Sequence, residues 1–211
     1  MKGMYFDNIH SYRDLNLVLS SVNIPPATAK TTFVDIPGGD GSVDLTEALG
    51  EVKYKDRGCT FTFSVFPYED FEEKKKHISN ILNGRQCKIT LDKDFEYYWV
   101  GRCTVDSYAS NKNLHKIVVK ATVTPYKLKR TQTIVTIPAG TSVVRMLENG
   151  RKSVVPTITT TAAATVIFEG NTYNLGVGTH TILNIELKHG RHQVTVTSTS
   201  PVVFTYQEGD L

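Results

Sequence analysis

The stretch CTFTFSVFPYEDFEEKKKHISNILN, residues 59–83, contains the two patterns that decide the fold of the first half of the chain. Over residues 59–66, polar and apolar side chains alternate with period two, which predicts a strand with one buried face that ends at Pro67. Over residues 69–83, acidic residues come first, lysines follow, and the apolar residues share one side. This second pattern predicts a helix that packs against a sheet and stops at Asn83-Gly84.

Three further apolar runs follow this helix. They are QCKITL at 86–91, FEYYWVGRCTV at 95–105 and LHKIVVKATVTPY at 114–126, and we expect each to form a strand, with a tight turn around Asp92–Asp94 between the first two. Residues 1–130 are therefore predicted to be an α+β domain, a sheet with one helix against it.

The composition changes after the basic stretch Lys127–Arg130, where we place a domain boundary. Residues 131–211 contain sixteen threonines and neither cysteine nor tryptophan. Short β-rich runs, among them TIVTI, TVIFEG, NTYNL, HQVTVTS and VVFTYQ, are separated by hairpin-type turns. We therefore expect residues 131–211 to form an antiparallel β-sandwich, which makes the whole chain mainly β with an α+β first domain.

The segment between residues 22 and 44 has few periodic apolar positions, and we interpret it as an extended arm that ends in a glycine-rich turn. Beyond the turn, Asp44 is placed to cap a short helix, with Glu47 completing a capping box and Gly50 ending the helix. An arm without a core of its own suits contacts between subunits. The candidate interface residues are Pro25, Pro26, Phe33, Ile36 and Pro37.

The three cysteines, at 59, 87 and 103, fall on the apolar faces of predicted strands. An odd number argues against a disulfide framework, so we expect three reduced thiols packed as small hydrophobic groups.

A net charge of +3 is too weak to indicate DNA binding, and no stretch approaches the length of a membrane span. Because residues 1–7 lack the apolar region of a signal peptide, we expect synthesis and folding in a cytosol.

The usual local signatures of catalysis and of nucleotide or metal binding are missing from the sequence, so we expect no enzyme, no cofactor and no metal site. The carboxylates at 92, 94 and 96 and the histidines at 189 and 192 fit solvated hairpins better than catalytic or metal sites. The alternative to a purely structural role is carbohydrate binding by the second domain, for which Tyr173, beside the turn at Gly170-Asn171, is the candidate contact.

The segment KTTFVDIPGGDGSVDLTEALGEVKYKDRGCTFTFSVF, residues 30–66, resembles the N-terminal domain of siphovirus and prophage distal tail proteins. The matching elements come in the family's order. They are Ile36-Pro37-Gly38, Asp40-Gly41, Asp44-Leu45-Thr46-Glu47-Ala48, Tyr54, Arg57 and Thr60-Phe61-Thr62-Phe63. The opening Tyr5–Ile9 also fits, whereas Gly39 stands where the family commonly has arginine.

This resemblance implies a structural virion protein at the tail tip. In the family, six first domains form a ring with an arm reaching a neighbouring subunit, and galectin-like or carbohydrate-module-like second domains project outward. The ring joins the tail tube protein to the baseplate hub, next to the tape-measure protein. DNA passes through the ring without specific binding, no membrane is involved, and assembly takes place in the cytoplasm of the host. Host surface polysaccharide is the partner implied by the alternative.

Overall fold

The computed structural model describes residues 3–48, 50–65, 70–110 and 114–211, and they divide into two compact units, Met1–Pro125 and Tyr126–Leu211. The predicted fold class is confirmed, since antiparallel sheets dominate both units and one α-helix is found among the described residues. The basic stretch at 127–130 supplies a strand to the second unit: β10 (Lys127–Lys129) pairs with β19 (Gly209–Asp210).

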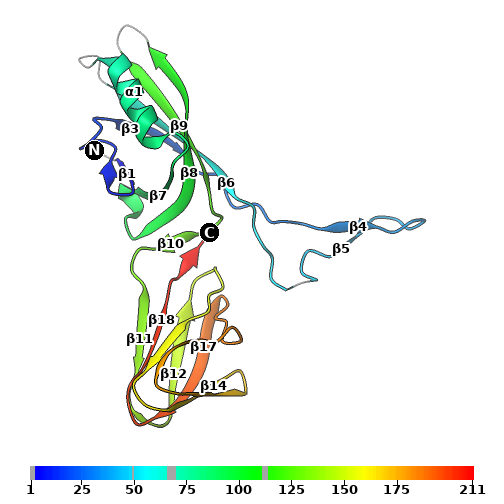
Figure 1. Ribbon diagram of the computed structural model, residues 1–211. Coiled ribbons are helices and arrows are strands. Elements are labelled where there is room, and N and C mark those ends of the chain that lie inside the picture. The colour runs from blue at the N-terminus through cyan, green and yellow to red at the C-terminus, as the bar shows by residue number, and fades with distance from the viewer. Residues whose placement is uncertain (1–2, 49, 66–69, 111–113) are drawn as a thin grey trace. The chain divides into compact units, whose positions relative to one another are not determined.

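The first unit is built on an antiparallel sheet with the strand order β2-β1-β7-β8-β9-β6-β3 (Figure 1). In chain order, its strands are β1 (Met4–Phe6), β2 (Ile9–His10), β3 (Val18–Asn23), β6 (Arg57–Val65), β7 (Gln86–Leu91), β8 (Tyr97–Ser110) and β9 (His115–Val123). A turn of 3-10 helix, Asp92–Asp94, joins β7 to β8 where the tight turn was predicted.

Strand β6 lies between β9 and β3, and its alternation is the one predicted from the sequence. Cys59, Phe61, Phe63 and Val65 are buried, whereas the residues between them are half-buried. The buried side faces a core that also includes Trp99 from β8. The predicted strand end at 66–67 lies outside the described residues.

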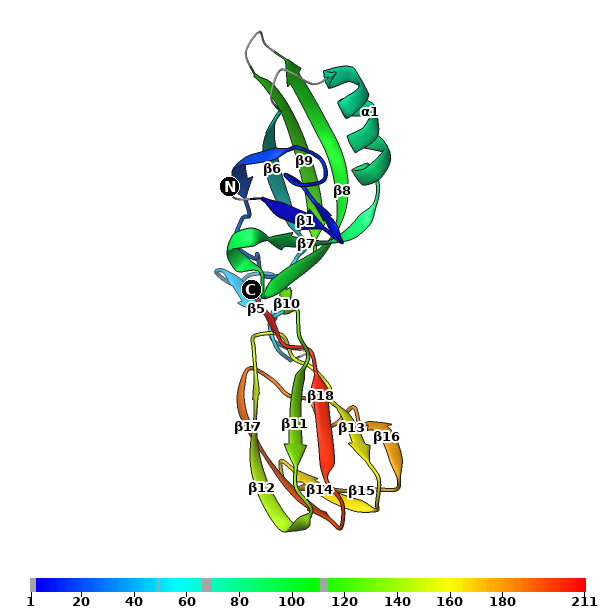
Figure 2. The same ribbon diagram turned by 90° about the vertical axis from the view of Figure 1, so that its left-hand side faces the viewer.

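Helix α1 (Phe71–Leu82) covers this core and lies along β8 (Figure 2). The carboxylate of Asp70 accepts hydrogen bonds from the backbone amides of Glu72 and Glu73, which caps the helix at its N-terminus. Ile78 and Leu82 are fully buried, so the predicted apolar side is confirmed. The helix ends at Asn83-Gly84 as predicted, with Gly84 at φ +75°. Residue 69, where the helix was expected to begin, lies outside the described residues.

The second unit consists of two four-stranded antiparallel sheets, with the orders β11-β18-β13-β16 and β12-β17-β14-β15. In chain order, the strands are β11 (Thr133–Ile137), β12 (Gly140–Asn149), β13 (Thr157–Thr160), β14 (Ala164–Phe168), β15 (Asn171–Leu175), β16 (Gly178–Thr181), β17 (Gly190–Ser198) and β18 (Val202–Tyr206). Phe204 of one sheet and Phe168 and Val196 of the other belong to a single buried cluster. This arrangement is a β-sandwich.

We predict that Phe63→Ala lowers the free energy of unfolding of the first unit by about 3–5 kcal/mol, because it leaves a cavity beneath β6. Trp99 is the only tryptophan and lies in the same core, so its fluorescence during urea unfolding reports on this unit alone. Ser64→Ala, on the opposite side of β6, is the matched control and should change stability by less than about 0.5 kcal/mol. Equal losses from the two variants would contradict this assignment of the buried face.

Candidate functional site

The predicted arm leaves the sheet after β3 and returns at the start of β6, and both of its limbs are hydrogen-bonded at the root. Ala29 and Tyr54 form an antiparallel bridge. The amide of Lys30 donates to the carbonyl of Lys53 at 2.7 Å, and the amide of Lys55 donates to the carbonyl of Thr28 at 2.8 Å. The two limbs therefore emerge as a pair, and the arm extends to about residue 54, beyond the predicted end at 44.

Arg57, the first residue of β6, fixes this root from inside the unit. Its guanidinium is buried and donates to the carbonyl of Pro25, at 3.5 Å, and to the carbonyl of Pro125. Loss of hydration on burial lowers the pKa of Arg57. The buried guanidinium thus links Pro25, in the outgoing limb of the arm, to Pro125, the last residue of the first unit.

Beyond the root, the arm is a two-stranded hairpin of β4 (Phe33–Asp35) and β5 (Ser42–Asp44). Val34 lies directly opposite Val43, and the hydroxyl of Ser42 donates to the carboxylate of Asp35 at 2.6 Å. The connecting turn contains Gly38 and Gly41, both at φ +78°, a conformation that glycine adopts without strain.

The predicted short helix after Asp44 is wrong for the residues that the structure describes. Asp44 ends β5, and its carboxylate accepts the backbone N–H of Thr46 at 2.9 Å. Hydrogen bonds from the side chain and backbone of Thr46 lower the pKa of Asp44. The amide of Ala48 bonds the carbonyl of Leu45, so isolated turns replace the helix, and residue 49 lies outside the described part. A carboxylate that caps a helix can equally close an Asx turn.

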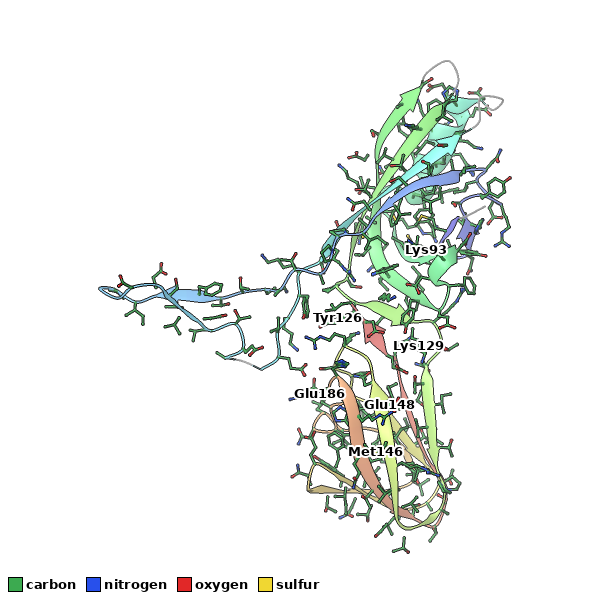
Figure 3. The ribbon with its side chains drawn as sticks, turned by 180° about the vertical axis from the view of Figure 1, so that it is seen from behind. Lys93, Tyr126, Lys129, Met146, Glu148 and Glu186 are labelled. Carbon is green, nitrogen blue, oxygen red and sulfur yellow. The ribbon has the colours of Figure 1, made fainter. Side chains whose placement is uncertain are left out.

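The hairpin is amphipathic, and its apolar face is uncovered. Strand alternation places Val34 and Ile36 of one limb on the same face as Val43 and Leu45 of the other. These four side chains are 42–55% exposed. The acidic residues Asp35 and Asp44 alternate onto the opposite face together with Phe33, which is 58% exposed. Figure 3 shows the hairpin extending from the sheet of its own unit.

The predicted interface residues occupy two parts of this arm. Pro25 and Pro26 lie at the root, whereas Phe33, Ile36 and Pro37 belong to the hairpin and its turn and are exposed. Their role in assembly stays a prediction. Sequence reasoning missed the apolar partners of Ile36, namely Val34, Val43 and Leu45. Alternation within the short runs FVDI and SVDL was the signal that could have identified them.

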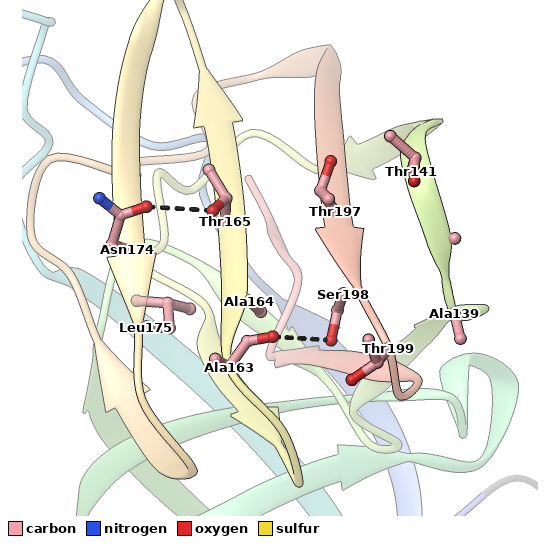
Figure 4. Close-up of a pocket in the computed structure, with 11 residues that line it drawn as sticks. Ala139, Thr141, Ala163, Ala164, Thr165, Asn174, Leu175, Thr197, Ser198 and Thr199 are labelled. Atoms are coloured by element: carbon pink, nitrogen blue, oxygen red, sulfur yellow. Dashed lines mark hydrogen bonds between the residues drawn. The ribbon is translucent and has the colours of Figure 1, made fainter.

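Tyr173, the predicted glycan contact, lies on the inward side of β15 and packs, half-buried, against the core of the second unit. Its neighbour Asn174 points the other way, into a depression of about 680 Å³ at the ends of β12, β14, β15 and β17 (Figure 4). Hydroxyl, amide and methyl groups line this depression, and the lining residues carry no charge. Thr165 donates to the side-chain oxygen of Asn174 at 3.0 Å, and Ser198 donates to the carbonyl of Ala163 at 3.2 Å.

Asp92 and His192 each contact polar groups of their own unit. Asp92 accepts the amide of Gly3 at 2.6 Å and lies 3.2 Å from His10 Nε2. His192 Nε2 lies 2.9 Å from the carbonyl of Lys188. Across the described part of the chain, no three metal-ligating side chains come together. None of the helical segments described has the length and hydropathy that a membrane crossing requires.

Comparison with known proteins gives a strong likeness at the level of structure. No family model matches the sequence, and no curated protein matches it significantly. The fold is similar to that in the crystal structure of SPP1 Dit (gp 19.1), described as a paradigm of the hub adsorption apparatus in phages that infect Gram-positive bacteria. The TM-score is 0.73 with 14% sequence identity, and the match covers 100% of both chains. The chain therefore has the fold of a siphophage distal tail protein, as the sequence resemblance predicted.

Proposed function

We propose that this protein is a non-enzymatic structural subunit of a phage tail tip, a distal tail protein that forms a ring. The observation that carries the proposal is the likeness to SPP1 Dit over the full length of both chains. Six copies would close the ring, in which each arm reaches a neighbouring first unit. Its partners would be the tail tube protein, the tape-measure protein and the baseplate hub, with DNA passing through the lumen and assembly in the host cytoplasm.

The uncovered face of the hairpin supports this role. A two-stranded hairpin alone is marginally stable in water, and this one exposes four large aliphatic side chains on one face. Contact with a second copy would remove them from water, at a gain on the order of 1 kcal/mol for each. Arg57 and the backbone bonds at the root would hold the arm in position for that contact.

Self-association can be measured by light scattering on a sizing column across a concentration series. A ring of six 23.5 kDa chains should have a mass of about 141 kDa. The double variant Val34→Lys with Val43→Lys places two charges on the apolar face and should raise the midpoint concentration of assembly at least about tenfold. Ser42→Lys adds charge to the opposite face of the same hairpin and should assemble like the wild type.

Two results would contradict the proposal. One is a wild-type chain that stays monomeric at every concentration, including in the presence of the tail tube protein. The other is a double variant that assembles at the wild-type concentration, which would remove the apolar face from the interface.

We retain glycan binding by the second unit as the alternative function, because the uncharged, hydroxyl-lined depression beside Asn174 suits a neutral sugar of a host surface polysaccharide. Ring formation and adhesion can coexist in one protein. On a panel of cell-wall glycans, Asn174→Ala should abolish binding if the depression is the site. Tyr173→Ala should instead lower the stability of the second unit by about 2 kcal/mol, because its ring packs against the core. Binding that Asn174→Ala leaves unchanged would exclude this site.

A further inference from the structure

Two of the three cysteines lie against each other inside the first unit. Cys87 on β7 and Cys103 on β8 have their Sγ atoms 3.3 Å apart, and both thiols are buried and free. The amide of Cys103 bonds the carbonyl of Arg85, so Cys87 is the diagonal neighbour of Cys103 on the same face. A disulfide needs the two sulfurs to approach to about 2.05 Å, a closure of little more than about 1 Å.

The third cysteine serves as an internal comparison. Cys59 on β6 and Cys103 on β8 both pair with Ala121 of β9, which lies between them. Two strand spacings of about 4.8 Å separate them, which is beyond the Cα separation of about 7 Å that a disulfide tolerates. Burial raises the pKa of the Cys59 thiol. All three thiols are buried, so what distinguishes Cys87 and Cys103 from Cys59 is a second sulfur within reach.

The contact between Cys87 and Cys103 also makes the two thiols chemically unequal. The hydrogen bond between the two thiols lowers the pKa of Cys87 and outweighs the opposing effects of burial and of the negative charge of Asp7. The same hydrogen bond, together with burial, raises the pKa of Cys103. Cys87 therefore has the greater thiolate character, the property that makes a thiol attack an oxidant.

A glycine turn lies next to the pair of cysteines. Gly84, at φ +75°, forms the turn between α1 and β7, and its amide bonds the carbonyl of Cys103. Arg85 follows and is exposed. Closure of the pair would require a small shift of the beginning of β7 relative to β8, and a glycine beside the pair is suited to take up the change in backbone dihedral angles.

We propose that Cys87 and Cys103 form an oxidation site that converts a small peroxide oxidant into an intramolecular disulfide. The Cys87 thiolate attacks one oxygen of hydrogen peroxide, the O–O bond breaks, and the products are a sulfenic acid on Cys87 and, after protonation, one water. The Cys103 sulfur then attacks the Cys87 sulfur and displaces the hydroxyl group as a second water. Both sulfurs are oxidised, and both peroxide oxygens are reduced. For a tail protein, this step would follow release from the reducing cytosol.

The test uses the purified full-length chain in native buffer with increasing hydrogen peroxide, followed by denaturation in a thiol-alkylating reagent. We expect two of the three thiols to be lost, with a mass decrease of two hydrogen atoms and a peptide map that links Cys87 to Cys103. Dithiothreitol should restore all three thiols. A sample oxidised in urea controls for reagent strength. The proposal would be overturned if the native sample kept three thiols while the sample in urea lost them. It would also be overturned by a disulfide that includes Cys59 or that joins two chains.

Single variants assign the two roles. Cys59→Ala should give the same disulfide as the wild type. Cys103→Ala should accumulate sulfenic or sulfinic acid on Cys87, because the second sulfur is missing. Cys87→Ala should slow thiol loss at least tenfold, and equal rates from these two variants would overturn the assigned order of attack. If either variant fails to fold, the wild-type peptide map still decides the disulfide. Light scattering of the same samples reports on assembly separately.

Discussion

Burial of one side of β6 is the interaction on which the first unit depends. Its aromatic and aliphatic side chains belong to the core to which α1 and β8 also contribute, while its other side carries threonine and serine. A slip of one residue in the register with β9 would turn every apolar side chain outward, so this alternation also fixes the neighbouring strands. Because β6 begins at Arg57, where the arm returns, the strand that organises the core also anchors the arm.

The hairpin repeats the alternation of β6 with the opposite outcome. In β6, the apolar side is covered by a helix and further strands of its own unit, whereas the apolar face of the hairpin meets no such layer. An alternating strand pair with one apolar face is stable when a third element covers that face. An apolar face can be removed from water either by other elements of the same unit or by a second subunit. The face of the arm is not covered by its own unit, so a second subunit could cover it.

The sequence predicted the elements whose periodicity is long or regular. Strand β6, helix α1 and the burial of the three cysteines followed from alternation and from the helical repeat. Strand β12 was not among the runs named from the sequence; a bulge between Gly140 and Val143, with Ser142 at φ 53°, interrupts its alternation. Tyr173 was named as a glycan contact from its place beside a turn; its half-buried side chain packs against the core of the second unit, and its role in glycan binding stays a prediction.

Contacts between residues far apart in the sequence could not be predicted from local patterns. The approach of Cys87 to Cys103 depends on the pairing of β7 with β8, and the apolar face of the arm depends on which residues of β4 and β5 lie opposite each other. A single sequence encodes these registers only through the packing of the whole unit. Local alternation identifies a face, and pairing decides which faces combine into a site.

This chain and SPP1 Dit share a fold over their full length at only 14% sequence identity. The fold therefore depends on the pattern of buried and exposed residues more than on the identity of most side chains. Cores accept many hydrophobic replacements as long as volume and pattern are kept, so a fold survives when most residues have changed. An interface or a glycan site depends on particular side chains and loses its specificity after a few substitutions. A shared fold therefore supports a shared scaffold more strongly than a shared partner, and the function of this chain has to be tested at the arm and at the depression beside Asn174.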